Sequence, residues 1–310
     1  MSRGFLTQIA DFLTNRKFRF NALSKLGFYR GMTDEKYLKR LFRVNMGKKL
    51  DLENPKTYSE KLQWLKLYDR RPEYVQMVDK IEVKKYVAEK IGEEYIIPTI
   101  GVWDNPDDID FDALPDKFAL KCNHNSGIGM VICKDKSKLD IEKVRDGLRR
   151  GLSQDYYMSG REWPYKDVKR RILAEQFMED EKTAELRDYK FFCFNGEAKM
   201  LFIASDRQKA GEETKFDFFD MDYNLLPFTN GHPNSKVLPE KPECFDKMRE
   251  LAEKLSEGIP QLRVDFYEVN GRIYFGELTF FHWGGMMPFE PEEWDYKIGE
   301  WIKLPDIEKS

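Results

Sequence analysis

Two carboxylates on neighbouring predicted strands are the residues of this sequence best placed to do chemistry. Asp265 and Glu277 fall on expected strands at 262–267 and 273–278, and Asn270-Gly271 has the residue types of the tight turn that joins such strands. Pairing across this hairpin can bring the two carboxylates side by side, facing the same way. They then repel each other unless a cation or a proton lies between them. Magnesium held on nucleotide phosphates is a natural cation for such a pair.

Arg263 lies two residues before Asp265 on the same expected strand, and therefore on the same face. A guanidinium at this place can stabilise an anionic intermediate. A solvated acidic face with an arginine partner is the plainer interpretation of the same charges. The surrounding side chains are unusually apolar for a solvated face, which favours the functional interpretation. They are Phe266, Tyr267, Phe275, Phe280 and Phe281.

Lys121 ends another expected strand and is followed by a loop at 123–129 that leads into the next strand. Gly127 and Gly129 allow the backbone of this loop to approach a ligand closely. Successive N–H groups in such a turn can hold a phosphate, and Lys121 supplies a positive charge. No helix follows directly, so the loop is neither a Walker A loop nor a Rossmann turn. An ordinary flexible hairpin is the alternative.

A third candidate lies at the end of the strand expected at 172–177. There Glu175 and Gln176, with Met178 just beyond, place polar groups and exposed backbone before an acidic loop. Such a strand end can hydrogen-bond the edge of an adenine ring. Any edge strand offers the same groups, so this pattern is weak when taken alone.

The composition of the chain mainly excludes classes of protein. The chain has 310 residues, of which 41% are hydrophobic, and its charges nearly cancel to a net −3. Such a chain can fold around a sizeable core, and its charge balance disfavours a nucleic-acid binder. No apolar run approaches the roughly 20 residues of a membrane span. The N-terminus also lacks the pattern of a secretory signal.

The cysteines and histidines are widely spread and show no metal-binding spacing. Without a CxxC pair, the cysteines are typical of reduced thiols in a cytoplasmic protein. A zinc site is disfavoured for the same reason. The residues are Cys122, Cys133, Cys193 and Cys244, with His124, His232 and His282.

The chain divides into a helical first part and a strand-rich remainder. Helices are expected at 33–47, from Thr57, and at 79–92, after which strands at 95–97 and 100–102 begin the second part. Tight-turn pairs in that part predict antiparallel hairpins and exclude a purely parallel barrel. We therefore expect an α+β protein in several lobes.

The segment up to Met32 is locally basic and carries apolar residues on one face of an expected helix. We favour a helix that packs on the body of the protein. The alternative is a peripheral contact with an anionic membrane, at its inner face for a cytoplasmic protein. The apolar residues are Phe5, Leu6, Ile9, Phe12 and Leu13.

Taken in order, these features resemble the ATP-grasp superfamily. Its members have a lysine ahead of the central lobe, a second lysine with a glycine-rich loop, an adenine-binding strand that ends in Glu, and an Arg-x-Asp strand hairpinned to a Glu-x-Asn strand. The corresponding residues here are Lys80; Lys121 with Ser126, Gly127, Ile128 and Gly129; Glu175 to Met178; Arg263 with Asp265; and Glu277.

A narrower resemblance is to the teichuronopeptide-biosynthesis (TupA-like) branch of that superfamily. The segments 54–64 and 187–196 look like its signature motifs, and Asp206-Arg207 follows the second one. The likeness extends from Lys36 to Pro305. The long motifs are specific, whereas single lysines are not.

The resemblance implies an α+β ATP-grasp fold, in which two α+β lobes sandwich ATP behind a short helical N-terminal region. It divides the chain into the helical region 1–92, a central or lid lobe 93–178, and a C-terminal lobe 179–310 with the metal site. The implied ligands are Lys80 and Lys121 for the phosphates of ATP, Glu175, Gln176 and Met178 for adenine, and Asp265 and Glu277 for Mg²⁺.

The reaction implied is an ADP-forming carboxylate–amine ligation. A substrate carboxylate attacks the γ-phosphate of ATP, and an amine then displaces phosphate from the acyl phosphate to leave an amide. Lys190, Arg207 and Arg263 would stabilise the transferring phosphoryl group and the tetrahedral intermediate. The branch further implies a uronic-acid cell-surface polysaccharide, or its precursor, joined to an amino acid or another amine.

Two departures from the family pattern and one rival motif keep other interpretations open. Thr279 stands where the superfamily has a second metal-binding Asn, so a second magnesium is in doubt and a binding protein that has lost its chemistry is a rival. The first part is short and helical, where a typical member has a nucleotide-fold domain that helps bind the carboxylate. Asp220-Met221-Asp222 has the Asp-x-Asp form of a nucleotide-sugar glycosyltransferase, although this segment also suits a turn.

Overall fold

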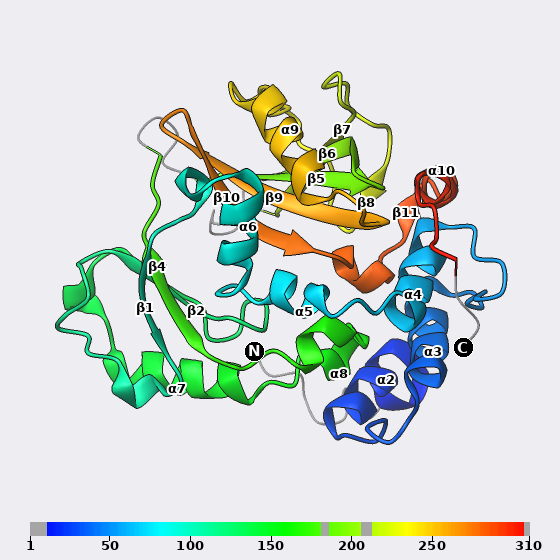
Figure 1. Ribbon diagram of the computed structural model, residues 1–310. Helices are drawn as coiled ribbons and strands as arrows, with labels where there is room; N and C mark the ends of the chain where they lie inside the picture. The colour runs from blue at the N-terminus through cyan, green and yellow to red at the C-terminus, as the bar shows by residue number, and fades with distance from the viewer. Residues whose placement is uncertain (1–10, 181–185, 206–212, 307–310) are drawn as a thin grey trace.

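Two antiparallel sheets, each packed against helices, build the two lobes of the protein (Figure 1). The computed structural model describes residues 11–180, 186–205 and 213–306. Within these ranges the strands pair in antiparallel fashion, as the tight turns of the sequence predict. The expected α+β class is confirmed.

The C-terminal lobe contains a five-stranded sheet in the order β10-β9-β5-β6-β7. Its strands are β5 (Asp188–Phe194), β6 (Glu197–Ser205), β7 (Lys215–Phe219), β9 (Gln261–Val269) and β10 (Arg272–Thr279). Every residue of β5 is buried, which requires side-chain cover on both faces of the sheet. Helix α9 (Phe245–Leu255) packs against β5 and β6, and helices from the first part of the chain complete the same core.

The central lobe contains a four-stranded sheet in the order β1-β4-β2-β3. Its strands are β1 (Thr99–Trp103), β2 (Phe118–Cys122), β3 (Val131–Cys133) and β4 (Ile172–Gln176). Phe118 and Leu120 of β2 pack in one core with Val144 and Leu148 of helix α7 (Ile141–Ser153). Side chains alternate along a strand, so Lys121 points to the opposite face of the sheet, toward the other lobe.

The first part of the chain is helical, but it is not a separate unit. Its helices are α2 (Arg16–Lys25), α3 (Asp34–Met46), α4 (Tyr58–Tyr68), α5 (Glu73–Val78) and α6 (Val83–Ile91). A capping box between Thr57 and Glu60 begins α4. Side chains of α4, α5 and α6 share one hydrophobic core with the five-stranded sheet, whereas α2 and α3 form small clusters of their own. The core therefore does not divide at residue 92.

Short elements complete the lobes. They are the helices α8 (Tyr157–Gly160) and α10 (Glu293–Trp301), the strands β8 (Thr229–Asn230) and β11 (Phe289–Glu290), and the 3₁₀ turns η1 (Glu93–Tyr95), η2 (Pro106–Asp108), η3 (Lys136–Lys138), η4 (Trp163–Lys166) and η5 (His282–Gly285). Tyr157 and Trp163 join the core of the C-terminal lobe, although they follow the central-lobe helix in sequence.

Local structure differs from the sequence expectation at three places. The strand expected at 95–97 is instead the turn η1 followed by irregular backbone. The helix expected from Asp79 begins at Val83, because the Asp79 carboxylate accepts the N–H of Ile81 at 2.8 Å and holds a turn there. Helix α5 was not expected. The apolar face proposed for the N-terminal helix falls partly on residues 1–10, outside the described residues.

None of the described helices combines the length and apolarity that crossing a membrane requires.

The close approach of α10 to the start of α4 depends on Gly299. A Cβ at this position would lie 2.3 Å from the Lys56 carbonyl oxygen and 2.7 Å from the Tyr58 nitrogen, both of which are backbone atoms. We expect Gly299→Ala to lower the free energy of unfolding by about 1–3 kcal/mol, because the backbone of one element must shift. Urea denaturation measures this change.

Gly147→Ala in α7 is the matched control for that substitution. A Cβ there meets no atom within 4 Å, so it is expected to leave stability unchanged or raise it by about 0.5–1 kcal/mol. Equal unfolding midpoints for the two variants would contradict the close packing of α10 on α4.

Candidate functional site

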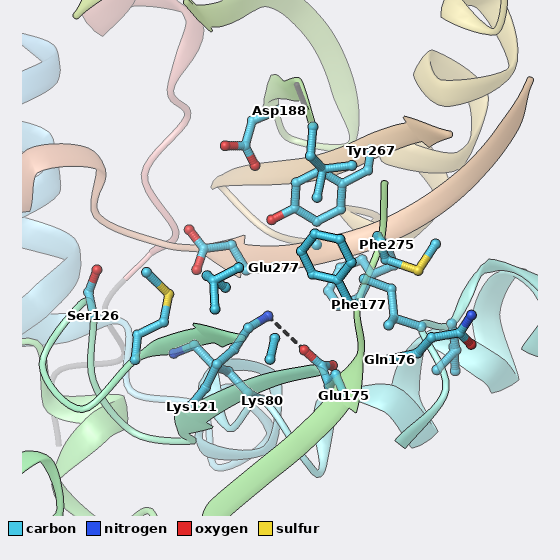
Figure 2. Close-up of a pocket in the computed structure, with 18 of the residues that line it drawn as sticks. Lys80, Lys121, Ser126, Glu175, Gln176, Phe177, Asp188, Tyr267, Phe275 and Glu277 are labelled. Carbon is cyan, nitrogen blue, oxygen red and sulfur yellow. Dashed lines mark hydrogen bonds and ion pairs between the residues drawn. The ribbon is translucent and has the colours of Figure 1, made fainter. Parts of the chain in front are cut away.

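A pocket of about 440 Å³ lies between the two lobes (Figure 2). Its walls come from β2 and β4 of the central lobe, from β5, β9 and β10 of the C-terminal lobe, and from the segment that leads into α6. Six of the residues singled out in the sequence for nucleotide binding line it together with Glu277. They are Lys80, Lys121, Ser126, Gly127, Gln176 and Met178, and a seventh, Glu175, lines it as well.

The central-lobe side of the pocket concentrates positive charge around one buried carboxylate. Lys121 Nζ lies 2.6 Å from Glu175 Oε2, and Lys84 Nζ lies 2.7 Å from Oε1. Lys80 Nζ donates to the Asn125 carbonyl at 2.6 Å. Burial lowers the pKa of Lys80 and of Lys84, and repulsion from Lys121 adds to the effect. Three lysines facing one carboxylate suit a polyanion such as a chain of phosphates.

Glu175 has a second role beside the adenine contact that the resemblance implies, which stays a prediction. Burial raises its pKa, but Lys121 and Lys84 outweigh burial and lower the pKa overall, so this side chain is an ionised carboxylate that orients two lysines. The strand β4 is interior to the sheet, because it pairs with both β1 and β2. Gln176 N is bonded to the Pro98 carbonyl, so the backbone that remains open for a ligand begins at Phe177.

The opposite end of the pocket is apolar and aromatic. Phe177 and Phe275 come from different lobes and lie close together in Figure 2, with Gln176 beside them. Ile97 and Met178 are also in the wall. A flat apolar group with hydrogen-bonding edges fits between such side chains, since pockets of this kind bind through apolar walls and a few polar groups.

Asp265 and Glu277 are directly opposite each other across the hairpin, and a bulge is the reason. Regular pairing from the turn at Asn270 places Phe275 opposite Phe266, and continuing it would place Gly276 opposite Asp265. The register instead shifts by one residue and brings Glu277 to that place. A Cβ at Gly276 would lie 3.1 Å from the Asp265 carbonyl oxygen, so glycine favours this close approach.

The cation between the two carboxylates is Arg263. Its Nε and Nη2 donate to the two oxygens of Asp265 at 2.7 Å each, and Nη2 also donates to Glu277 Oε1 at 2.8 Å. Lys190 forms a further ion pair with Asp265. The sequence predicts a cation between these two carboxylates, and the protein itself supplies it. Asp265 is too deeply buried to line the pocket.

Glu277 is the carboxylate that faces the pocket, where its side chain keeps 43% of its exposure. Burial opposes its ionisation, but Arg263, Lys190, Lys80 and Lys121 outweigh burial and lower its pKa to about 2. It is therefore an anion at any physiological pH. Of the positions expected to hold metal, this one is open to a ligand.

The donor set fits magnesium that arrives on a nucleotide. Within the described residues no group of three or more His, Cys, Asp and Glu side chains is placed to hold a metal ion. Magnesium commonly takes one or two carboxylates, with phosphate oxygens and water completing its shell. Glu277 and Asp188 both line the pocket and supply such carboxylates, whereas Asp265 is held by Arg263 and Lys190.

The pocket geometry agrees with a family match over most of the chain. Residues 60–303 match the family model described as TupA-like ATP-grasp. The chain belongs to the TupA-like ATP-grasp family. Members of the ATP-grasp superfamily are ATP-dependent ligases. The resemblance to this family, and the ATP-grasp fold that it implies, are confirmed.

The chain also has a weak similarity to solved structures of two D-alanine–D-alanine ligases and one synthase. A D-alanine–D-alanine ligase from Helicobacter pylori is 15% identical with a TM-score of 0.39, over 74% of this chain and 63% of that chain. One from Bacillus anthracis is 14% identical with a TM-score of 0.38, over 78% and 67%. An N5-carboxyaminoimidazole synthase from Aspergillus clavatus, solved with ADP, is 14% identical with a TM-score of 0.38, over 67% and 46%. No curated protein matches the sequence.

Four expected site residues of this ATP-grasp chain lie elsewhere or outside the described ranges. Gly129 packs against α7, where an added Cβ would lie 3.1 Å from the Gly147 carbonyl oxygen, so helix packing rather than a ligand requires glycine there. Arg263 and Asp265 lie behind the pocket wall. Arg207 falls in 206–212, outside the described residues, and its role stays a prediction.

The Asp-x-Asp segment is a turn, and the glycosyltransferase alternative loses its metal site. Asp220 Oδ1 accepts the backbone N–H groups of Asp222 at 2.9 Å and Asn224 at 2.8 Å, and Oδ2 accepts the Asn224 amide at 3.0 Å. Both oxygens therefore hold the turn at the end of β7. Neither aspartate is among the residues that line the pocket.

The sequence did not reveal the support behind Arg263. Asn230 donates its amide nitrogen to the Met287 and Pro288 carbonyls, so its oxygen faces His282 Nε2 at 3.2 Å. His282 Nδ1 then accepts from Arg263 Nη1 at 2.9 Å. Burial and the charges of Arg263 and Lys190 lower the pKa of His282 well below its usual value, so the ring is neutral. A lone histidine in the sequence gave no signal of this contact.

His282 offers a test of this support. We expect His282→Ala to lower kcat for ADP formation by about 10–100-fold, because Arg263 loses one acceptor and can leave its productive orientation. His282→Asn, whose side-chain oxygen can take the place of Nδ1, should recover part of the loss. The rate of ADP release in the presence of acid and amine gives kcat. A thermal shift measured with ATP-Mg²⁺ is expected to show that nucleotide binding is unchanged. Full activity in folded His282→Ala would contradict a positioning role.

Proposed function

We propose that the protein is an ATP- and Mg²⁺-dependent carboxylate–amine ligase that forms an amide through an acyl phosphate. The observation that carries this proposal is one pocket in which Lys121 of the central lobe and Lys80 before α6 face Glu277 and Lys190 of the C-terminal lobe. Membership of the ATP-grasp family supports the same reaction class. A mere nucleotide-binding protein does not need a buried guanidinium that donates to Asp265, Glu277 and His282 behind its pocket.

Each part of the pocket has a role in this proposal. Lys80 and Lys121 hold the phosphates, and the backbone after Gln176 binds the edge of adenine between Phe177 and Phe275. Glu277 holds Mg²⁺, which neutralises phosphate charge when it is bound. Asp265 acts at one remove, because its two oxygens fix Arg263 and Lys190. In this proposal the lid lobe and the C-terminal lobe enclose ATP, and the helical first part packs on the C-terminal lobe.

The proposed reaction has two steps. A carboxylate oxygen of the acceptor attacks the γ-phosphorus of ATP, and the bond to the bridging oxygen breaks to release ADP. The amine then attacks the acyl carbon, loses a proton, and expels inorganic phosphate. Arg263, Lys190 and Arg207 neutralise the negative charge that gathers on the phosphoryl and tetrahedral oxygens.

The proposed substrates are a uronic-acid unit of a cell-surface polysaccharide or its precursor, and an amino acid or another amine. The motifs shared with the teichuronopeptide-biosynthesis branch support this choice. A cytoplasmic location, with ATP as the donor, accompanies it. A nucleic acid finds no broad basic surface in a chain of net charge −3.

An ADP-release screen of uronic acids against amines tests the ligase proposal. We expect ADP formation that requires Mg²⁺, acid and amine together, and a loss of at least about 100-fold in Glu277→Gln, because a carboxylate that holds the metal is removed. Glu268→Gln, on the same hairpin but outside the pocket, is the matched control. ATP-Mg²⁺ should raise the melting temperature and UDP-sugars should not.

Two outcomes of that screen decide between the rivals. A thermal shift with UDP-sugars and none with ATP-Mg²⁺ would favour a glycosyltransferase. A shift with ATP-Mg²⁺, combined with equal and minimal turnover in wild type and Glu277→Gln, would favour the binding protein that lacks catalysis.

We also propose that the tip between α2 and α3 contacts an anionic membrane surface. Leu26 and Phe28 at this tip are 81% and 71% exposed. Lys25 and Arg30 flank them. Apolar groups surrounded by cationic side chains match a bilayer whose surface carries negative charge.

Vesicle co-sedimentation tests this contact. Wild type is expected to bind vesicles rich in phosphatidylglycerol, and to bind pure phosphatidylcholine vesicles weakly, because salt-sensitive attraction supplements the apolar contact. Replacing both Leu26 and Phe28 by Glu should abolish binding without affecting ADP release. Val237→Glu, at an equally exposed apolar position elsewhere, is the matched control. Undiminished binding of the double variant would refute the proposal.

A further inference from the structure

Two lysines share the buried carboxylate of Glu175, and their surroundings differ. Lys84 Nζ lies 2.7 Å from Glu175 Oε1, and Lys121 Nζ lies 2.6 Å from Oε2. Lys84 Nζ also donates to the Ile97 carbonyl and to Thr99 Oγ1, at 2.8 Å each. An ammonium group has three N–H donors, and three acceptors surround this one. Lys84 is therefore held on Glu175 with no donor left for a ligand.

Lys121 keeps donors for a ligand. Among the residues that the structure describes, the one hydrogen-bond partner of its ammonium group is Glu175 (Figure 2). The side chain of Lys121 is 22% exposed and lies in the pocket wall. Its remaining N–H groups are free to meet a phosphate oxygen that enters the pocket. Of the two lysines on Glu175, Lys121 is thus the one that can turn to a nucleotide.

Helix α6 fixes Lys84 from the side of the C-terminal lobe. Val83 and Val87 of this helix lie in the core of that lobe, and the Tyr86 hydroxyl donates to the Leu255 carbonyl of α9 at 2.9 Å. The strands β1 and β4, which supply acceptors for Lys84, belong to the central lobe. A side chain that is held from both lobes has little freedom to follow a ligand.

Charge explains why this carboxylate has two lysines. Glu175 and Lys121 alone carry no net charge, and such a pair attracts an anion only weakly. With Lys84 the group has two ammonium groups and one carboxylate, and its net charge is +1. The wall of the pocket then presents a positive charge to an incoming chain of phosphates.

We propose that Lys84 is a positioning residue that stays on Glu175 while Lys121 turns to the phosphates of ATP, and that it thereby sets the affinity for the nucleotide. This inference rests on the proposed ATP-dependent function and adds a residue that acts through Glu175. With Lys84 in place, Lys121 can be drawn toward a phosphate and Glu175 still has a counter-ion. Without Lys84, the same movement leaves a buried carboxylate unpaired, which is costly.

The nucleotide affinity of charge variants tests this role. Calorimetric titration of the full-length protein with ATP-Mg²⁺ and with tripolyphosphate-Mg²⁺ measures the affinity with and without the adenosine part. We expect Lys84→Met to weaken the binding of both ligands by about tenfold. At saturating ATP, kcat for ADP release should fall by less than about threefold, because lost ground-state binding raises KM. Lys84→Arg, which keeps the charge, should recover part of the affinity.

A second substitution separates this role from a general loss of structure. Glu175→Gln removes the carboxylate that attracts Lys121, so this variant alone should bind tripolyphosphate more tightly than wild type. The double variant with Lys84→Met and Glu175→Gln regains a positive group, and its affinity for tripolyphosphate should return to within about threefold of wild type. A merely structural role of Lys84 predicts that the double variant stays as weak as Lys84→Met, because the contact between the lobes is missing in both.

Lys85→Met is the matched control. Lys85 is the next residue of α6, and its side chain is 74% exposed, so the substitution removes the same charge without touching Glu175. Its affinities should equal those of wild type.

The outcomes separate this inference from the ligase proposal. Equal ATP affinity of wild type and Lys84→Met, or a double variant as weak as Lys84→Met, overturns the role of Lys84 even if ADP release proceeds. If Lys84→Met does not fold, Glu175→Gln decides, and no gain in its affinity for tripolyphosphate overturns the role. A wild type that binds no ATP overturns the ligase proposal, on which the inference rests.

Discussion

The buried guanidinium of Arg263 is the constraint on which the site depends. A charge taken out of water is costly unless ion pairs and hydrogen bonds replace its hydration. Arg263 meets this demand with both oxygens of Asp265, one of Glu277 and Nδ1 of His282. Each partner sits where a separate feature puts it. The bulge at Gly276 aligns Glu277, and the turn that follows β10 delivers His282.

The two lobes have the same electrostatic arrangement on opposite sides of the pocket, in which a buried carboxylate orients two cations. In the central lobe, Glu175 is buried and accepts from Lys121 and Lys84. In the C-terminal lobe, Asp265 is buried and accepts from Arg263 and Lys190. The oxygens of each carboxylate align cations and do not bind a ligand. The groups left facing the pocket are then the lysines and Glu277, a combination suited to phosphates that carry magnesium.

Much of this arrangement follows from local sequence. The Asn270-Gly271 turn and the alternation around Lys121 place their residues correctly, because turn type and strand period depend on nearest neighbours. What the sequence could not supply were choices made by tertiary contact. Gly276 within the strand is compatible with a bulge but does not by itself fix the register, and the pairing of Asp265 with Glu277 would fail without the bulge. The packing of Gly129 on α7 is likewise invisible, because a glycine in a loop suits a ligand and a helix equally well.

The helical first part acquires a role from the same reasoning. A typical member of the superfamily uses a nucleotide-fold domain on the acceptor side, whereas here α4 shares the core of the C-terminal sheet. Its buried Lys66 is an unfavourable choice for stability, since burial lowers the pKa of this side chain to about 8. An apolar side chain would avoid that cost but would leave the Gly284 carbonyl without this donor. Retaining the lysine makes sense if the turn η5, whose backbone is left-handed at Trp283 and Gly284, must be held in one conformation, and that turn also carries His282. The helix thus holds the turn that carries His282 and, through His282, the orientation of Arg263.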